Sequence, residues 1–220
     1  MTDEPRILER VATPRGELVL RQVGDDLEVI SNGIFLMDTR DGGSERALVR
    51  EAVVGHPAPR RVLIGGLGVG FSLLEALLHP GVERVDVVEI EQVLVDWHAV
   101  HLRERTGAAL ADPRVHVVVA EVRDHLAARP QGYDAACLDV DNGPDWTVTA
   151  ANAGLYDSDG VADCVNALAP GGVLAVWSAA PAPAYEQLLR QHLDDIRVME
   201  IPPYVGRGAP DAVYLGTRRN

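Results

Sequence analysis

The stretch RVLIGGLGVGFSLLEALL, residues 61–78, decides the fold. Its apolar start predicts a buried strand at 61–65, and its later part has the period of an amphipathic helix at 70–79. Between the two lie four glycines within six residues, namely Gly65, Gly66, Gly68 and Gly70. Glycines between a strand and a helix let backbone amides approach a ligand closely, so this loop is a candidate cofactor-binding loop.

From Arg61 onward, apolar runs alternate with helical segments. Strands are predicted at 61–65, 84–89, 115–119, 134–139 and 173–177, and helices at 70–79, 91–105, 122–128, 160–168 and 184–194. This alternation predicts an α/β domain with a doubly wound, Rossmann-like and mostly parallel sheet. Two further runs, 196–201 and 211–217, flank a Pro/Gly loop and predict a C-terminal antiparallel hairpin at the sheet edge.

Residues 1–55 are predicted to form a small N-terminal β-region with a linking helix, ahead of the α/β domain at 56–220. Within 16–33, two β-rich runs surround Gly24-Asp25-Asp26, which indicates a hairpin, and Asn32-Gly33 is a second turn signal. The linking helix is predicted at 44–54 from its helical period.

Composition excludes several chemistries. The 220 residues carry a formal net charge of −13, and all 20 basic residues are arginines. Without lysine, neither a pyridoxal phosphate anchor nor a P-loop lysine can form. The acidic balance argues against a nucleic-acid partner and suits a cationic small molecule. With no membrane-spanning run and no signal-peptide pattern, we expect a cytoplasmic protein without a membrane partner.

The cysteines and histidines do not form a metal-binding pattern. Cys137 and Cys164 lie in apolar surroundings without a close His or Cys, so we expect two small buried hydrophobic residues and no metal. His98 and His101 fall on the helix predicted at 91–105, where a solvated or half-buried position is expected.

Acidic residues follow the second and third predicted strands of the α/β domain. Glu89 ends the second strand, about twenty residues after the glycine loop, where a carboxylate typically binds ribose hydroxyls. Glu121 follows the third strand, where it would either accept a hydrogen bond from an adenine amino group or complement a helix dipole. The loop and Glu89 together predict a nucleoside site, and NAD(P) stays open on this pattern alone.

The fourth strand runs into LDVDNGPDW, residues 138–146, which contains Asp139, Asp141 and Asp145. A cluster of carboxylates at a strand end can hold a cationic substrate and take a proton from an amine. Crowded carboxylates also raise one another's pKa, which suits a general base near neutrality. Asp139 and Asp141 are therefore the candidate catalytic residues, and a solvated Asp-rich turn is the alternative.

Over about residues 30–180 the sequence resembles the spermidine synthase (polyamine aminopropyltransferase) family, whose catalytic domain has the class I methyltransferase fold. RVLIGGLGVG resembles that family's strand followed by GGGDGG, and VERVDVVEIE resembles VxxVxxVEID. DPRVHVVVAEVRDHL resembles DPRVxVxxxDGxxFL, and LAPGGVLAVWS resembles LxPGGxLxxQ. YDAACLDVDNGP stands where the family has YDVIIxDxxDPxGP.

The resemblance implies S-adenosylmethionine or its decarboxylated form as the cofactor, and a cationic amine as the second substrate. It implies that Glu89 binds the ribose, that Glu121 binds the adenine amino group, and that Asp139 or Asp141 binds the attacking amine. Dimers are common in the family, so the resemblance is also compatible with a homodimer.

This sequence departs from the family pattern at several positions. Gly68 replaces the aspartate of GGGDGG, which contacts the aminopropyl end of the cofactor, and the catalytic loop is two residues shorter. The family's glutamine falls on Leu36, and its Tyr-His pair falls on Glu45-Arg46. Three hypotheses stay open: transfer of an aminopropyl-type group to an amine, methyl transfer to a small molecule, and a non-catalytic nucleoside-binding or dimerisation module.

Overall fold

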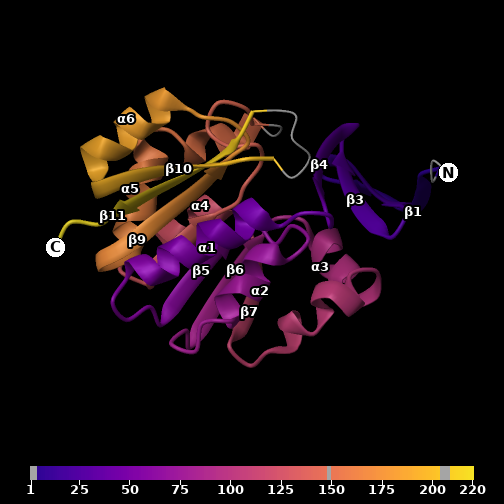
Figure 1. Ribbon diagram of the computed structural model, residues 1–220, viewed down its shortest axis with the longest axis horizontal. Helices are drawn as coiled ribbons and strands as arrows, with labels where there is room; N and C mark the ends of the chain where they lie inside the picture. Colours follow the sequence, from indigo (N-terminus) through magenta and orange to yellow (C-terminus); the bar gives the residue numbers. More distant parts are fainter. Residues whose placement is uncertain (1–3, 148–149, 204–208) are drawn as a thin grey trace. The chain divides into compact units, whose positions relative to one another are not determined.

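The computed structural model describes residues 4–147, 150–203 and 209–220. The chain divides into two compact units, the first ending at Gly42 and the second comprising Gly43–Asn220. The first unit is built from strands alone, whereas the second combines a large sheet with helices, as the ribbon in Figure 1 shows.

The first unit is an antiparallel meander in the order β1-β2-β3-β4. Its strands are β1 (Arg6–Thr13), β2 (Gly16–Val23), β3 (Asp26–Ser31) and β4 (Ile34–Asp38). Gly24 (φ 62°) lies in the turn between β2 and β3, and Asn32 (φ 50°) and Gly33 (φ 81°) form the turn between β3 and β4. Both turns predicted from the sequence are confirmed, because these residue types tolerate the left-handed backbone that tight hairpins require.

The second unit contains a seven-stranded sheet in the order β10-β11-β9-β8-β5-β6-β7. Its strands are β5 (Arg61–Gly65), β6 (Arg84–Glu89), β7 (Val115–Val119), β8 (Tyr133–Leu138), β9 (Leu168–Ser178), β10 (Asp194–Ile201) and β11 (Asp211–Thr217). Strands β5 to β9 pair in parallel, and β11 runs antiparallel to both of its neighbours, β9 and β10. The predicted doubly wound sheet with a C-terminal antiparallel hairpin is therefore confirmed.

Helices cover both faces of this sheet. They are α1 (Gly43–Gly55), α2 (Phe71–Leu77), α3 (Gln92–Val100), α4 (Val122–Ala127), α5 (Ser158–Ala167) and α6 (Pro183–His192). One core cluster joins α1 and α2 to the sheet, and a second joins α4, α5 and α6 to the opposite face. The domain boundary predicted from the sequence assigns α1 to the N-terminal region, residues 1–55. In the structure, its buried residues Leu48, Val49 and Ala52 pack within the second unit.

The helix predicted at 91–105 is shorter than expected. Helix α3 ends at Val100 and is followed by a π-helical turn, Arg103–Gly107, and a 3₁₀ turn, Ala109–Ala111. A further 3₁₀ segment spans Ala150–Leu155. Leu102 is fully buried, and its carbonyl accepts backbone hydrogen bonds from Arg105, Thr106 and Gly107, which widens this turn.

Both cysteines are buried and unpaired, as the sequence predicts. Cys137 lies on β8 and Cys164 on α5, in the two separate core clusters. Burial raises the pKa of both thiols, so they remain protonated and act as small apolar side chains.

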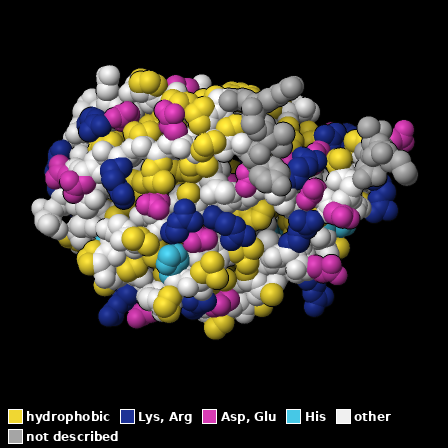
Figure 2. Space-filling view, in the orientation of Figure 1, with side chains coloured by type: hydrophobic (Ala, Val, Ile, Leu, Met, Phe, Trp, Pro, Cys, Tyr) yellow, Lys and Arg dark blue, Asp and Glu magenta, His cyan; other side chains and the backbone are white. Residues whose placement is uncertain are grey.

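The surface mixes charges of both signs. On the face shown in Figure 2, arginine and acidic side chains are interspersed among apolar ones. Across the described ranges, no helix has the length and apolar character needed to cross a membrane.

A buried polar chain connects α4, β8 and β6. Arg129 Nη1 lies 3.2 Å from Nδ1 of His125, whose Nε2 lies 2.7 Å from the hydroxyl of Tyr133. That hydroxyl donates to Asp86 Oδ2 at 2.8 Å, while Arg84 donates to Oδ1 at 2.8 Å. Each carboxylate oxygen of Asp86 thus has a partner, which is needed because the residue is only 3% exposed.

We expect Tyr133→Phe to lower the free energy of unfolding by about 1–3 kcal/mol, because the buried carboxylate of Asp86 loses a hydrogen-bond donor. Urea denaturation measures this change. Tyr185→Phe is the matched control: Tyr185 is equally buried, but its hydroxyl has no hydrogen-bond partner among the described residues. Equal losses in the two variants would contradict a stabilising role for the polar chain.

Candidate active site

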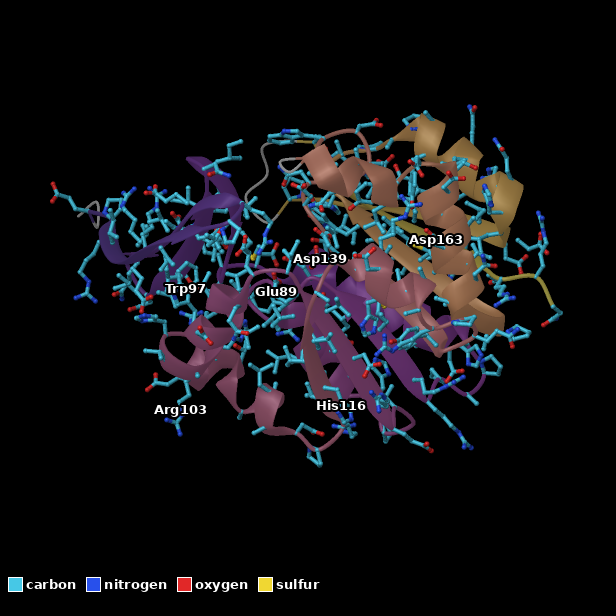
Figure 3. The ribbon with its side chains drawn as sticks, turned by 180° about the vertical axis from the view of Figure 1, so that it is seen from behind. Glu89, Trp97, Arg103, His116, Asp139 and Asp163 are labelled. Carbon is cyan, nitrogen blue, oxygen red and sulfur yellow. The ribbon has the colours of Figure 1, made fainter. Side chains whose placement is uncertain are left out.

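The candidate site lies at the carboxyl ends of three neighbouring strands. Strand β5 lies between β6 and β8, and the glycine loop, residues 65–70, leads from β5 into α2. Glu89 ends β6, and Asp139 directly follows β8. Figure 3 shows these two side chains near each other, with Arg103, His116 and Asp163 on other parts of the unit. The strand order reverses here, which is where open α/β sheets bind ligands.

The glycine loop packs closely against its neighbours. Gly66 has a φ of 93° and donates its N–H to the carbonyl of Val88 at 2.8 Å. A Cβ atom on Gly66 would lie 2.1 Å from the backbone oxygen of Asp139. A Cβ on Gly70, whose φ is 94°, would lie 2.9 Å from Cγ2 of Thr106. Both positions therefore require glycine for packing as well as for backbone conformation.

Glu89 is held in place by backbone donors. Its side chain is buried; Oε2 accepts a hydrogen bond from the N–H of Leu67 at 2.9 Å, and Oε1 accepts one from the N–H of Glu91 at 2.8 Å. Burial raises the pKa of Glu89, while these backbone hydrogen bonds oppose the rise. The backbone N–H of Ile90 also bonds this carboxylate, so three backbone donors fix the side chain and one acceptor position is left for a ligand hydroxyl.

Asp139 is buried beside other acidic side chains. Its backbone N–H donates to the carbonyl of Gly65 at 2.8 Å, and Ser72 Oγ lies 3.4 Å from Oδ2. Burial, followed by the negative charges of Glu45, Asp211 and Glu89, raises the pKa of Asp139 to about 8, whereas Ser72 opposes the rise. The carboxyl group can therefore gain or lose a proton near neutral pH.

Asp141 faces a different partner from Asp139. It adopts a φ of 61° and accepts a hydrogen bond from Nδ2 of Asn152, in the segment Ala150–Leu155, at 2.9 Å. Asp145, two residues after the turn at Gly143, is exposed. Of the aspartates in this loop, Asp139 is the one that meets the acidic residues around the glycine loop.

Glu121 lies at the same edge of the sheet, between the end of β7 and the start of α4. Its carbonyl accepts the N–H of His125 at 3.1 Å, and its side chain makes no capping hydrogen bond to α4. The sheet order places β7 two strands from β5. The structure thus brings Glu89 and Asp139 together and leaves Glu121 further along the edge.

The sequence did not reveal the role of His98. Its side chain is fully buried, with Nε2 3.0 Å from the carbonyl oxygen of Gly68 and Nδ1 2.6 Å from Oγ1 of Thr106. The expected solvated or half-buried position is wrong, because the ring turns inward beneath the glycine loop. Glu45 and Asp211 were also missed as neighbours of Asp139, since they lie on α1 and β11 and share no motif.

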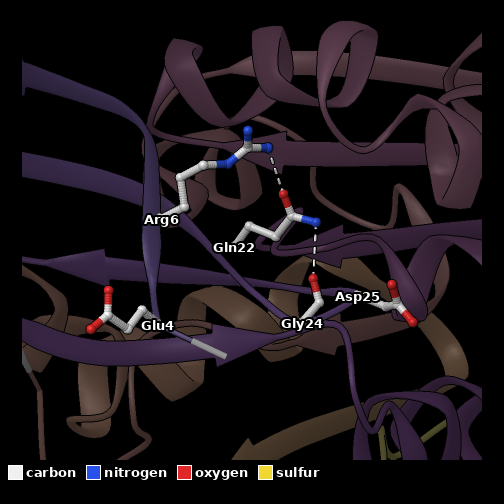
Figure 4. Close-up of a pocket in the computed structure, with 5 residues that line it drawn as sticks. All are labelled: Glu4, Arg6, Gln22, Gly24 and Asp25. Carbon is white, nitrogen blue, oxygen red and sulfur yellow. Dashed lines mark hydrogen bonds between the residues drawn. The ribbon is translucent and has the colours of Figure 1, made fainter. Parts of the chain in front are cut away.

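A separate pocket opens on the first unit (Figure 4). It has a volume of about 390 Å³ and is lined by Glu4, Arg6, Gln22, Gly24 and Asp25. Arg6 donates to Gln22 Oε1 at 2.7 Å, and Gln22 donates to the carbonyl of Gly24 at 2.9 Å. None of the predicted site residues lines this pocket, so it is distinct from the candidate active site.

Metal-ligating residues do not gather in the described part of the chain. Among residues 4–147, 150–203 and 209–220, no group of three or more His, Cys, Asp or Glu is placed to hold a metal ion.

The reversal of strand order, the glycine loop and the acidic strand end are those of a doubly wound α/β domain of the Rossmann-like class. The family model of the spermine/spermidine synthase domain matches residues 43–197. The chain therefore belongs to the spermine/spermidine synthase family.

Relatives and solved structures agree with this assignment. The polyamine aminopropyltransferase of Mycobacterium tuberculosis strain H37Rv is 34% identical over 169 residues, which cover 75% of this chain and 31% of the relative. That of Aeropyrum pernix is 34% identical over 159 residues, covering 67% and 48%. The chain therefore spans about a third to a half of these curated relatives. A spermidine synthase solved with the transition state analogue AdoDATO has the same fold, with a TM-score of 0.86 at 18% identity over 96% of this chain and 73% of that one.

We expect Gly66→Ala to destabilise the protein more than Gly171→Ala. Both glycines have a positive φ, so each substitution costs about 1–2 kcal/mol in backbone strain. At Gly171 the new Cβ meets its nearest atom at an ordinary 3.5 Å, whereas at Gly66 it collides with the backbone oxygen of Asp139 and adds roughly 1–3 kcal/mol. Urea unfolding of both variants tests this. Equal losses in the free energy of unfolding would show that the loop shifts to accommodate the new methyl group at Gly66.

The raised pKa of Asp139 also predicts how stability depends on pH. A carboxyl group with a higher pKa in the folded state binds its proton more tightly there, so its contribution to stability falls as pH rises from about 4 to about 8. Asp139→Asn removes this dependence, which has a slope of at most about 1.4 kcal/mol per pH unit. Urea unfolding of both proteins across this range measures it. Parallel stability profiles would contradict the raised pKa.

Proposed function

We propose that this chain is an aminopropyltransferase that moves an aminopropyl group from decarboxylated S-adenosylmethionine to a cationic amine. The observation that carries the proposal is the carboxyl group of Asp139, with a pKa of about 8, beside the glycine loop and Glu89. The names of the relatives, polyamine aminopropyltransferases, and the analogue bound by the structural neighbour support the choice of chemistry.

The reaction requires an amine that has lost its proton. The positive sulfur of the sulfonium substrate makes the adjacent carbon open to displacement. The amine nitrogen forms a bond to that carbon while the carbon–sulfur bond breaks, and the electron pair of that bond stays on sulfur. Asp139 takes the proton of the ammonium group, which its pKa near 8 permits at neutral pH.

The other residues bind and orient the substrates. Glu89, fixed by the N–H groups of Leu67 and Glu91, accepts a ribose hydroxyl. Glu121 is proposed to accept a hydrogen bond from the adenine amino group, and Asp141 to add negative charge on the side of the amine. The negative charges of Glu45 and Asp211 lie close enough to act on Asp139. A cationic acceptor bound beside Asp139 would be attracted by the same charges.

One observation favours a second candidate function. Gly68 brings no side chain to the position where the resembling family has an aspartate for the aminopropyl end. A glycine at this position is compatible with the carboxylate and amino groups of intact S-adenosylmethionine, whose reaction here would be methyl transfer to a small molecule.

Calorimetric titration of the full chain with decarboxylated S-adenosylmethionine, S-adenosylmethionine, S-adenosylhomocysteine and 5′-methylthioadenosine distinguishes these functions. Aminopropyl transfer predicts binding of the decarboxylated form and of 5′-methylthioadenosine. Preferential binding of S-adenosylmethionine and S-adenosylhomocysteine would contradict aminopropyl transfer and favour methyl transfer. Binding of none of the four would exclude both transferase functions.

We expect Asp139→Asn to lower turnover by about 10²-fold or more, because the amide cannot take the proton of the attacking amine. Release of 5′-methylthioadenosine with a panel of diamines, followed by mass spectrometry, measures turnover. Nucleoside affinity should stay within about threefold. Asp145→Asn, on the same loop but exposed, is the control and should keep its activity. Nucleoside binding without turnover in the wild type would favour a non-catalytic module.

A further inference from the structure

The side chain of His98 links helix α3 to the glycine loop through one defined tautomer. The carbonyl oxygen of Gly68, 3.0 Å from Nε2, can only accept a hydrogen bond, so Nε2 must carry the hydrogen. Burial lowers the pKa of His98, which keeps the ring neutral. Nδ1 is then an acceptor, and the single hydrogen of the Thr106 hydroxyl points to it at 2.6 Å rather than to the carbonyl of Leu102 at 3.2 Å.

The π-helical turn places Thr106 for this contact. The N–H groups of Thr106 and Gly107 both point to the carbonyl of Leu102, at 2.8 and 3.3 Å, so the turn holds one more residue than an α-helix would. Thr106 is only 3% exposed. A Cβ on Gly107 would lie 2.7 Å from the carbonyl oxygen of His98, so the turn packs directly on α3.

The same pair of side chains supports the end of the glycine loop. A Cβ on Gly70 would lie 2.9 Å from Cγ2 of Thr106 and 3.0 Å from Cε1 of His98. The loop is thus held at two points: Glu89 of β6 binds the N–H of Leu67, and His98 of α3 binds the carbonyl of Gly68.

We propose that His98, oriented by Thr106, is a positioning residue that orders the glycine loop for nucleoside binding. A loop rich in glycine loses much conformational entropy when a ligand fixes it, and an anchor that fixes it beforehand reduces that loss. Because Gly68 has no side chain, its carbonyl is the group through which α3 holds this position. This inference rests on the proposed nucleoside site.

Paired variants of the full chain test the proposal. His98→Gln keeps an N–H donor near the position of Nε2, and His98→Leu removes it. Thr106→Ser keeps the hydroxyl, and Thr106→Val removes it. His116→Leu, on an exposed position of β7 away from the loop, is the control. Thermal unfolding checks that each variant is folded.

Calorimetric titration with 5′-methylthioadenosine provides the main measurement. We expect His98→Leu and Thr106→Val to raise its Kd about tenfold, the usual effect of one lost hydrogen bond. His98→Gln and Thr106→Ser should stay within about threefold of the wild type, and the control should not change. If His98→Leu fails to fold, the comparison of Thr106→Val with Thr106→Ser tests the positioning role instead.

A long-range ¹H–¹⁵N NMR spectrum of the histidine side chains tests the tautomer independently, with the His98→Gln variant assigning the signal. The proposal expects a neutral ring protonated on Nε2, and protonation on Nδ1 would overturn it. Equal affinities in all variants would overturn the positioning role and leave the proposed function in place. Failure of the wild type to bind 5′-methylthioadenosine would overturn both.

Discussion

The close approach of the glycine loop to strand β8 is the constraint on which the rest of the site depends. The backbone oxygen of Asp139 leaves no room for a side chain on Gly66, and the N–H of Asp139 bonds the carbonyl of Gly65. The turn that exposes loop backbone to a ligand therefore also fixes the backbone of the candidate base. Any change that widens this contact moves the glycine loop and the carboxyl group of Asp139 together.

The electrostatics of the site follow from the same geometry. Burial at the sheet edge makes each ionised carboxylate costly, so the pKa of Glu89 and that of Asp139 are both raised. The two carboxyl groups differ in their hydrogen bonds and in the charges near them. Glu89 accepts backbone hydrogen bonds on both oxygens, whereas Asp139 has one long contact with Ser72 and faces further negative charge. Glu89 is therefore suited to binding a ligand, and Asp139 to gaining and losing a proton.

Local patterns predicted most of the fold but only part of the site. The apolar runs and glycine turns placed strands β5 to β11, because each signal lies within a few residues. The sequence predicted that Glu89 and Asp139 lie together, because the carboxyl ends of parallel strands meet at one edge. The burial and contacts of His98 were not predicted, because they depend on a π-helical turn that has no recognisable periodicity in the sequence. Glu45 and Asp211 reach Asp139 only through tertiary packing, which residue spacing does not encode.

The insertion of β11 between β9 and β10 decides where part of the charge around Asp139 comes from. It brings Asp211 close enough to act on Asp139, whereas the glycine loop and Glu89 follow β5 and end β6. Asp211 and the glycine loop therefore belong to segments far apart in the sequence. Substitution of Asp211 can change the charge around Asp139 while the glycine loop and Glu89 keep their sequence.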